Sequence, residues 1–281
     1  MNDELYNLYL KCFPDYSCSR EWFDILLKPD QAVVFAEHEN NQLIAFSMIW
    51  GNSISLLCVD PAHQNKRIGS RLLKKSEEHI SQNDAEKIIL GCGPNYLLQG
   101  VPTTNTKTVL FFEKRGYKAG WTSVNMALAL DGFSCEKINI PALPSDILFR
   151  FADDMDKDAL LAAVDDAQPN WRGVFETCVD PVLLAVESKT NKLIGFEVLS
   201  FNGGRFIKNA GCIGCVGIIP SARNKGIGRR MVVEGIEWLK SQGSSCIELR
   251  YVALVDWYKT LGFEITGSQW MGEKELKQKI L

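Results

Sequence analysis

The apolar positions of the chain form short β-branched runs that alternate with longer stretches of helical spacing. Residues 213–219 form an apolar run that predicts a buried strand, and Pro220 ends it. A polar turn and Gly226 follow. From Ile227 to Leu239, apolar residues recur at the spacing of an amphipathic helix. The pattern predicts a strand, a glycine-containing turn and a helix.

This turn has the features of an anion site. The N–H groups of residues 224–229 would converge at the first turn of the helix, where the helix dipole adds positive potential. Such a site suits a phosphate or a pyrophosphate. Gly226 would let a ligand approach the backbone closely, and Gly228 would leave room where the helix begins.

An internal repeat predicts the domain organisation. Residues 56–73 match the later strand, turn and helix in order and spacing, with Gln64 at the position of Arg223 and Gly69 at that of Gly228. A second pair follows the two turns, because residues 112–117 match residues 258–263. The chain therefore contains two copies of one unit.

The segment Arg223-Asn224-Lys225-Gly226-Ile227-Gly228 resembles the acyl-CoA pyrophosphate loop of the GNAT superfamily of N-acyltransferases. That signature is Arg or Gln, two residues, Gly, one residue, then Gly or Ala. The segments 112–117 and 258–263 also resemble the helix-to-strand segment of that family. The resemblance implies an α/β (α+β) fold of two tandem GNAT domains, each a mixed, mostly antiparallel sheet flanked by helices. We expect a degenerate domain at 1–130, a linker at 131–146 and a catalytic domain at 147–281.

The other runs predict the remaining elements. In the first half they are helices 3–13, 20–28, 67–82 and 106–115, strands 32–37, 43–50, 54–59, 87–90, 117–121 and 123–130, and a long loop at 91–104. In the second half they are strands 147–151, 182–187, 193–201, 246–251 and 263–267, a helix that follows an acidic start at 153–156 and ends at 164, and helices at about 170–178 and 254–260. The first half lacks the usual first strand of the family, so a partner strand would come from elsewhere in the chain. The tail 272–281 is expected to be frayed or a short helix.

The activity implied by the resemblance is transfer of an acetyl group from acetyl-CoA to a primary amine of a small molecule or a peptide, by direct attack in the second half. A backbone N–H near residues 216–218 would stabilise the thioester oxygen. Tyr258 stands at the position of the tyrosine that protonates the leaving thiolate. Glu197 is a candidate general base, since it interrupts an apolar strand. The other candidate bases are Glu187, Glu248, Asp165 and Asp166.

The resemblance also implies the residues that hold coenzyme A. In the second half they are Val216, Gly217, Ile218, Arg223, Asn224, Lys225, Gly226, Ile227, Gly228 and Arg229. In the first half they are Val59, Gln64, Asn65, Lys66, Arg67, Ile68, Gly69, Ser70 and Asn105, of which Asn105 would orient the pantetheine arm. In this half Arg67 replaces the middle glycine and Phe112 replaces the tyrosine, so we assign transfer to the second half. We expect no metal site, because Cys212 and Cys215 would face opposite sides of a strand.

Composition narrows the function further. A net charge of -3 argues against nucleic acid as a partner. No apolar run approaches the length of a membrane span, and the N-terminus lacks the features of a signal peptide. Nine scattered cysteines predict reduced thiols and a cytoplasmic monomer or homodimer. The alternative to an enzyme is a non-catalytic acyl-CoA-binding sensor or interaction module.

Overall fold

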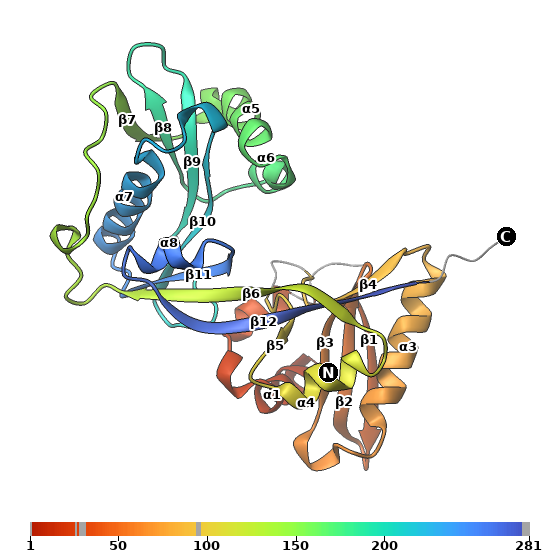
Figure 1. The fold of residues 1–281 in the computed structure, drawn as a ribbon. Coiled ribbons are helices and arrows are strands. Elements are labelled where there is room, and N and C mark those ends of the chain that lie inside the picture. The colour runs from red at the N-terminus through yellow and green to blue at the C-terminus, as the bar shows by residue number, and fades with distance from the viewer. Residues whose placement is uncertain (1, 26, 28–31, 94–96, 277–281) are drawn as a thin grey trace. The chain divides into compact units, whose positions relative to one another are not determined.

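The computed structural model describes residues 2–25, 27, 32–93 and 97–276. The chain forms two compact units (Figure 1). Unit 1 contains residues 1–124 and 267–281, and unit 2 contains residues 125–266. The units therefore divide the chain differently from the expected sequence repeats. The 131–146 segment belongs to unit 2, and the C-terminal segment belongs to unit 1.

Unit 1 begins with helices and continues as a sheet. The helices are α1 (Asn2–Cys12), α2 (Arg20–Ile25), α3 (Ile68–Gln82) and α4 (Thr106–Glu113). The strands are β1 (Ala32–Glu39), β2 (Gln42–Trp50), β3 (Ser53–Val59), β4 (Lys87–Leu90) and β5 (Val101–Pro102), together with parts of β6 (Lys118–Ala129) and β12 (Glu264–Glu275). The expected helix 20–28 extends beyond the described residues at its end. So does part of the loop 91–104, which also contains the short strand β5.

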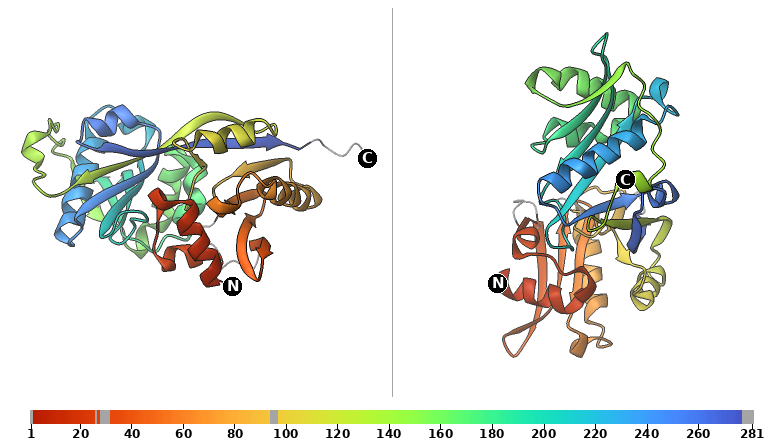
Figure 2. Two further views of the ribbon diagram at one scale, coloured as in Figure 1. Left: turned by 90° about the horizontal axis from the view of Figure 1, so that it is seen from below. Right: turned by 90° about the vertical axis from the view of Figure 1, so that its left-hand side faces the viewer.

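The sheet of unit 1 is mixed. Strands β1, β2 and β3 are antiparallel neighbours, β3 and β4 are parallel, and β12 pairs antiparallel with β4. Helices α1 and α3 lie on opposite sides of strands β1–β3 (Figure 2). The parallel pairing of β3 with β4 ends at Ile54 and Leu90, so the rest of β3 has no β4 partner. The sheet thus opens toward the turn that follows β3.

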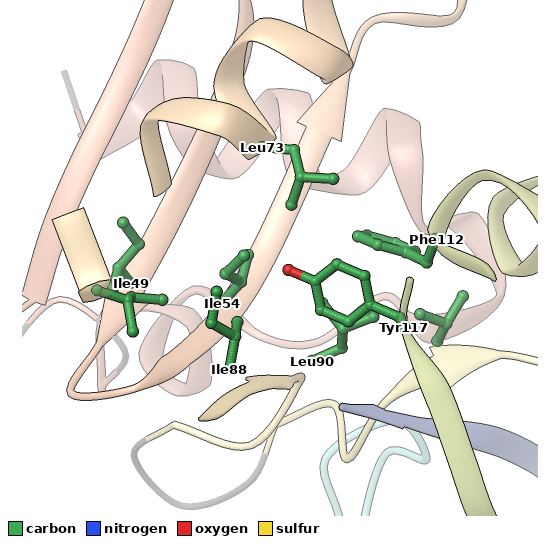
Figure 3. Close-up of a cluster of buried hydrophobic side chains, with 9 residues drawn as sticks. Ile49, Ile54, Leu73, Ile88, Leu90, Phe112 and Tyr117 are labelled. Carbon is green, nitrogen blue, oxygen red and sulfur yellow. The ribbon is translucent and has the colours of Figure 1, made fainter. Parts of the chain in front are cut away.

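Apolar side chains from β3, β4, α3 and α4 form a buried cluster on the α3 side of the sheet (Figure 3). Phe112 and Tyr117 face each other in this cluster, with ring centroids 5.3 Å apart. The hydroxyl of Tyr117 donates to Glu77 Oε1 at 3.0 Å, which satisfies the only polar atom of that side chain. Phe112, at the position of Tyr258 in the repeat, is a core residue.

Unit 2 repeats the same order of elements. Its strands are β7 (Ile147–Phe151), β8 (Val182–Glu187), β9 (Leu193–Ser200), β10 (Ala210–Ile218) and β11 (Cys246–Val252). Its helices are α5 (Lys157–Ala167), α6 (Arg172–Glu176), α7 (Ile227–Ser241) and α8 (Val255–Lys259). Strands β7 to β10 are antiparallel neighbours, and β10 is parallel to β11. Helix α7 covers one face of β8–β10, and α5 and α6 cover the other (Figure 1).

Two long strands run from one unit into the other. The expected strands 117–121 and 123–130 are one continuous strand, β6, because the residues between them include no glycine, proline or asparagine that would form a tight turn. The tail prediction was also wrong for residues 272–275, which continue strand β12 and pair with β4. The strand that joins unit 1 from elsewhere in the chain is β12, but it pairs with β4 and not with β1, so it does not replace the missing first strand. It lies at the opposite side of the unit 1 sheet from β1.

Candidate functional site

The predicted anion-binding turn of unit 2 has the expected backbone. Strand β10 ends at Ile218, a short 3-10 turn follows at Pro220–Ala222, and α7 begins at Ile227. Asn224 has φ 63° and Gly226 has φ 79°. These two left-handed residues turn the chain so that the first N–H groups of α7, which have no carbonyl partner within the helix, end at the turn. Because helix starts attract anions, the turn suits a phosphate group.

Arg223 stabilises this turn through its side chain. Its Nε donates to the carbonyl of Ile218 at 2.9 Å, and its Nη2 donates to the carbonyl of Ala167, in the last turn of α5, at 3.2 Å. In unit 1, Gln64 Nε2 donates to the carbonyl of Val59 at 3.3 Å. The first residue of the motif therefore binds the end of the preceding strand in both units, and Arg223 also connects the turn to α5.

The edge of β10 that precedes the turn is open toward β11. The two strands pair over Ala210–Cys212 and Cys246–Glu248 only. On its other edge β10 pairs with β9, with a bulge between Gly214 and Gly217 at which Cys215 has φ 49°. In the part of the chain that the structure describes, residues 216–218 thus have no β11 partner. An extended ligand that adds to this edge would meet backbone N–H and C=O groups.

Tyr258 comes from α8 and is largely buried. Its ring packs edge-on against Trp257 and Phe263, with centroids 4.7 Å and 5.5 Å away. Burial raises the pKa of its hydroxyl above the ordinary value, and the nearby groups Glu197, Cys212 and Cys215 raise it further. The hydroxyl therefore stays protonated at neutral pH. Among the described residues, no group forms a hydrogen bond with it, which leaves it available to a ligand.

The two buried glutamates of unit 2 lie in different surroundings. Glu197 is 0% exposed and packs against α7 at Gly235, and neither of its oxygens has a hydrogen-bond partner among the described residues. Burial, and then Glu234, raise the pKa of Glu197 well above its ordinary value. Burial therefore favours the protonated form of this carboxyl group, which suits a hydrogen-bond donor or proton source better than a base.

Glu248 is an ion-paired carboxylate at the point where β10 and β11 separate. Its Oε2 accepts the backbone N–H groups of Arg205 at 3.1 Å and Phe206 at 3.3 Å. Its Oε1 lies 3.6 Å from Nε of Arg250. Glu248 is directly opposite Cys212, the last residue of the paired stretch of β10. Its Oε1 makes this ion pair and accepts no hydrogen bond among the described residues.

Two of the other candidate bases, Asp165 and Glu187, form contacts elsewhere. Asp165 forms an ion pair with Arg172, which also binds Glu176 at 2.9 Å and so connects α5 to α6. Glu187 accepts a hydrogen bond from the hydroxyl of Thr190 at 2.8 Å.

The remaining loop residues of unit 2 take structural positions. Lys225 lines a small cavity together with Pro144 and Asp146. Ile227 is buried, and a Cβ at Gly228 would lie 3.3 Å from Cγ1 of Ile218. Helix α7 and strand β10 thus approach closely where the helix begins.

The turn of unit 1 keeps the same backbone without its glycine. Asn65 has φ 63° and Arg67 has φ 61°, so Arg67 takes the left-handed conformation that Gly226 takes in unit 2. Lys66 accepts a hydrogen bond from Arg71 through its carbonyl, and Ile68 is buried at the start of α3. The backbone of the anion site is preserved, although Arg67 is strained.

Three further residues of unit 1 have contacts within the protein. A Cβ at Gly69 would lie 3.5 Å from Cγ2 of Val59, which matches the contact at Gly228. The hydroxyl of Ser70 accepts a hydrogen bond from Arg115 at 2.8 Å. Asn105, expected to orient the pantetheine arm, caps α4 by accepting the N–H of Thr108 at 3.1 Å. Its side-chain carbonyl is therefore occupied.

Two contacts of the unit 2 turn escaped the sequence reasoning. Arg229 donates two hydrogen bonds to Thr260, and Pro141 of the 131–146 segment lies against Gly226. Neither contact has a signal in the local pattern. Both partners are distant in sequence, and a threonine after a helix or a proline in a linker is common in any chain.

Known proteins confirm the family. The model of the "Acetyltransferase (GNAT) family" matches residues 2–117 and 151–263, which together make up most of the chain. The chain belongs to the GNAT acetyltransferase family. Its two matched regions confirm the predicted repeat, and the mixed, mostly antiparallel sheets with flanking helices confirm the predicted fold class.

This GNAT protein is similar to acetyltransferases and to a tandem GNAT protein. It is 28% identical over 228 residues to a mycothiol acetyltransferase of Renibacterium salmoninarum, a match that spans 74% of this chain and 63% of that one. Its fold resembles a glucosamine N-acetyltransferase region of a fungal multi-domain β-N-acetylglucosaminidase (TM-score 0.85, 19% identity, 97% of this chain and 36% of that chain). It also resembles a tandem GNAT protein from the clavulanic acid biosynthesis pathway (TM-score 0.74, 13% identity, 98% and 94%).

Two further properties concern metal binding and membrane crossing. Within the described residues, no group of three or more His, Cys, Asp and Glu side chains is arranged to hold a metal ion. None of the described helices combines the length and the apolar character that crossing a bilayer requires.

Proposed function

We propose that this GNAT protein transfers an acetyl group from acetyl-CoA to a primary amine of a small molecule or a peptide, and that unit 2 carries the reaction. The observation that supports unit 2 is the combination of the left-handed turn at Gly226, the open edge of β10 and the protonated hydroxyl of Tyr258. Unit 1 has the turn and an open β3 edge, but Phe112 replaces the tyrosine. A sensor without catalysis would need only the first two features.

The residues of unit 2 fit acetyl-CoA, which supplies an activated thioester. N–H groups of residues 224–229 would hold its pyrophosphate, and an N–H of residues 216–218 would hydrogen-bond the thioester oxygen. The hydroxyl of Tyr258 would donate its proton to the leaving thiolate. Its hydroxyl is protonated before transfer, as that of an ordinary tyrosine is at neutral pH, and the raised pKa adds no acid strength, so the place of Tyr258 on α8 carries this assignment.

Removal of the proton from the attacking amine needs a separate group. We predicted Glu197 for this role, but its raised pKa favours the protonated form, so we propose Glu248 instead, which lies opposite Cys212 at the last paired position of β10. Glu197→Gln and Glu248→Gln separate the two. If Glu248 is the base, its variant loses about 100-fold or more in kcat, the scale of general-base catalysis, while Glu197→Gln keeps most of the activity. The reverse result would assign the base to Glu197.

Calorimetric titration of acetyl-CoA tests the binding site. Gly228 and Gly69 occupy equivalent helix starts, and a glutamate at either would add bulk and negative charge to one turn. We expect Gly228→Glu to abolish a binding event that Gly69→Glu leaves intact. Absence of any acetyl-CoA binding by the unsubstituted protein would contradict the proposal.

Tyr258→Phe distinguishes an enzyme from a sensor. With a panel of primary amines and a thiol-release assay, the enzyme should lose turnover in this variant and keep its affinity for CoA. An unchanged turnover would remove Tyr258 from the mechanism. Binding without turnover by the unsubstituted protein, across the panel, would favour the sensor.

A further inference from the structure

We call residues 223–229, where the acyl donor would bind, the donor turn of unit 2. Arg229, its last residue, connects this turn to α8, the helix that carries Tyr258. It is the third residue of α7, directly after Gly228. Its Nη1 donates to the hydroxyl oxygen of Thr260 at 2.6 Å, and its Nη2 donates to the carbonyl of Thr260 at 2.8 Å. The guanidinium group therefore binds the C-terminal end of α8.

Thr260 is itself hydrogen-bonded to α8. Its hydroxyl donates to the carbonyl of Trp257 at 2.6 Å, and its N–H bonds to the carbonyls of Asp256 and Trp257 at 3.3 Å and 3.1 Å. Helix α8 has only five residues, Val255–Lys259, so it has few hydrogen bonds of its own. Its position depends on outside contacts, of which the Arg229–Thr260 pair lies two residues after Tyr258.

Unit 1 makes the equivalent connection with the roles reversed. Ser70, at the position of Arg229, accepts from Arg115, which follows α4. Arg115 also donates to the carbonyl of Phe111 at 2.7 Å and stacks on the Phe111 ring. Both units thus use an arginine to connect the start of the helix after the turn with the end of the later helix. In unit 1 the arginine, Arg115, follows the later helix α4. In unit 2 the arginine, Arg229, belongs to the donor turn and reaches the end of α8, which carries the Tyr258 hydroxyl.

We propose that Arg229 is a positioning residue, which couples occupancy of the donor turn to the placement of the Tyr258 hydroxyl. This inference rests on the proposed function of unit 2. The guanidinium reaches both acceptors of Thr260 at once, and a lysine has a single ammonium group that keeps the charge without this two-point geometry. Arg229→Lys therefore removes the positioning and keeps the positive potential at the helix start.

Hydrogen exchange of the α8 amides tests the coupling without turnover. Residues 254–261 should exchange more slowly when CoA is added to the unsubstituted protein. The control is Arg230→Lys, because Arg230 bonds Glu234 on the exposed side of α7 and makes no contact with α8. We expect the CoA effect on α8 in the unsubstituted protein and in Arg230→Lys, and its loss in Arg229→Lys. An effect that persists in Arg229→Lys overturns the inference.

Kinetics provide the second test. Arg229→Lys and Thr260→Val should each lower kcat at least fivefold and weaken CoA binding by a smaller factor, because coupling between two sites is reciprocal, and Thr260→Ser should restore kcat. In a Tyr258→Phe background, Arg229→Lys should cause no further loss. Additive losses would overturn the inference and leave the proposed function intact. Failure of the proposed function shows differently, as absent CoA binding or as unchanged turnover in Tyr258→Phe alone.

Discussion

Pro141 lies directly against Gly226, so that a Cβ atom at Gly226 would come within 2.7 Å of the Cβ of Pro141. Two independent constraints therefore require glycine at this position, since its φ of 79° already disfavours any side chain. The segment 131–146 is thus part of the wall of the donor turn. Its proline and the turn glycine form one packed contact.

Gly226→Ala should destabilise unit 2 more than a left-handed conformation alone would. Gly243 is the matched control, because it has φ 95° and no neighbour within 4 Å of its Cβ position. Both variants pay about 1–2 kcal/mol for the conformation, and only Gly226→Ala also overlaps with Pro141. Urea unfolding measures the difference, which should shrink when Pro141→Gly is added. An equal loss of unfolding free energy in Gly226→Ala and Gly243→Ala would show that the segment around Pro141 moves away from the added Cβ at no cost.

Arg67→Gly should stabilise unit 1. Arg67 has φ 61° at the start of α3, a conformation that costs a non-glycine residue about 1 kcal/mol or more. We expect a rise of about 1 kcal/mol in the free energy of unfolding, offset in part by the greater entropy of glycine in the unfolded chain. Arg67→Ala removes the side chain and keeps the strain, so it should give no such rise. A gain in the alanine variant would assign the effect to the charge.

Glu197→Gln should change how stability depends on pH. The pKa of Glu197 is raised in the folded protein, while the unfolded chain ionises this residue near 4.5. As pH rises above 4.5, the unfolded state loses a proton that the folded state keeps, so this residue lowers stability by up to about 1.4 kcal/mol per pH unit. The penalty is absent below 4.5 and stops growing above the folded pKa.

The test compares urea unfolding of the two proteins at pH 5 and pH 8. Glutamine cannot ionise, so the variant should gain stability relative to the unsubstituted protein at pH 8 and gain little at pH 5. The matched control is Glu187→Gln, on the neighbouring strand, whose carboxylate accepts from Thr190 near the surface. The same pH-dependent gain in both variants would mean that burial of Glu197 is not its cause.

Removal of residues 267–281 should unfold part of unit 1 and leave unit 2 folded. This segment pairs with β4 at Glu273–Glu275, and its Gln269 Oε1 accepts the N–H of Gly100 at 2.8 Å in a buried position. Hydrogen exchange should show lost protection in β4 and β5, with amides of α7 and β9 unchanged. Loss of protection in α7 would contradict the division into units.

Local patterns predicted the two turns well. The strand, the polar turn and the helix at Gly226 are contiguous in sequence, so their spacing contains the information that the structure confirms. Because residues 56–73 repeat this pattern, the sequence also predicts a turn in unit 1 with Arg67 at the start of the following helix, as the structure shows. The strain at Arg67 was not predictable, because an arginine has no sequence signal for a left-handed conformation.

Contacts between residues distant in the chain could not be predicted from the local sequence pattern. The sequence predicts two strands over residues 117–130, whereas the structure has one, β6, whose neighbours β11 and β12 are distant in the chain. The same holds for Glu197, whose apolar neighbours predict a buried strand but not the absence of a hydrogen-bond partner. Both properties depend on contacts with residues far away in the chain, and local sequence patterns do not show which distant residues meet.

The place of β12 in unit 1 reverses the usual order of folding during synthesis. Domains generally fold from the N-terminus as the chain leaves the ribosome. Here residues 125–266 are contiguous, whereas unit 1 waits for its strand at 267–275, which is synthesised after all of unit 2. Unit 2 is therefore complete first. Until residues 267–275 have left the ribosome, the edge of β4 has no strand partner from β12, and the nascent first half must be kept from pairing with other chains.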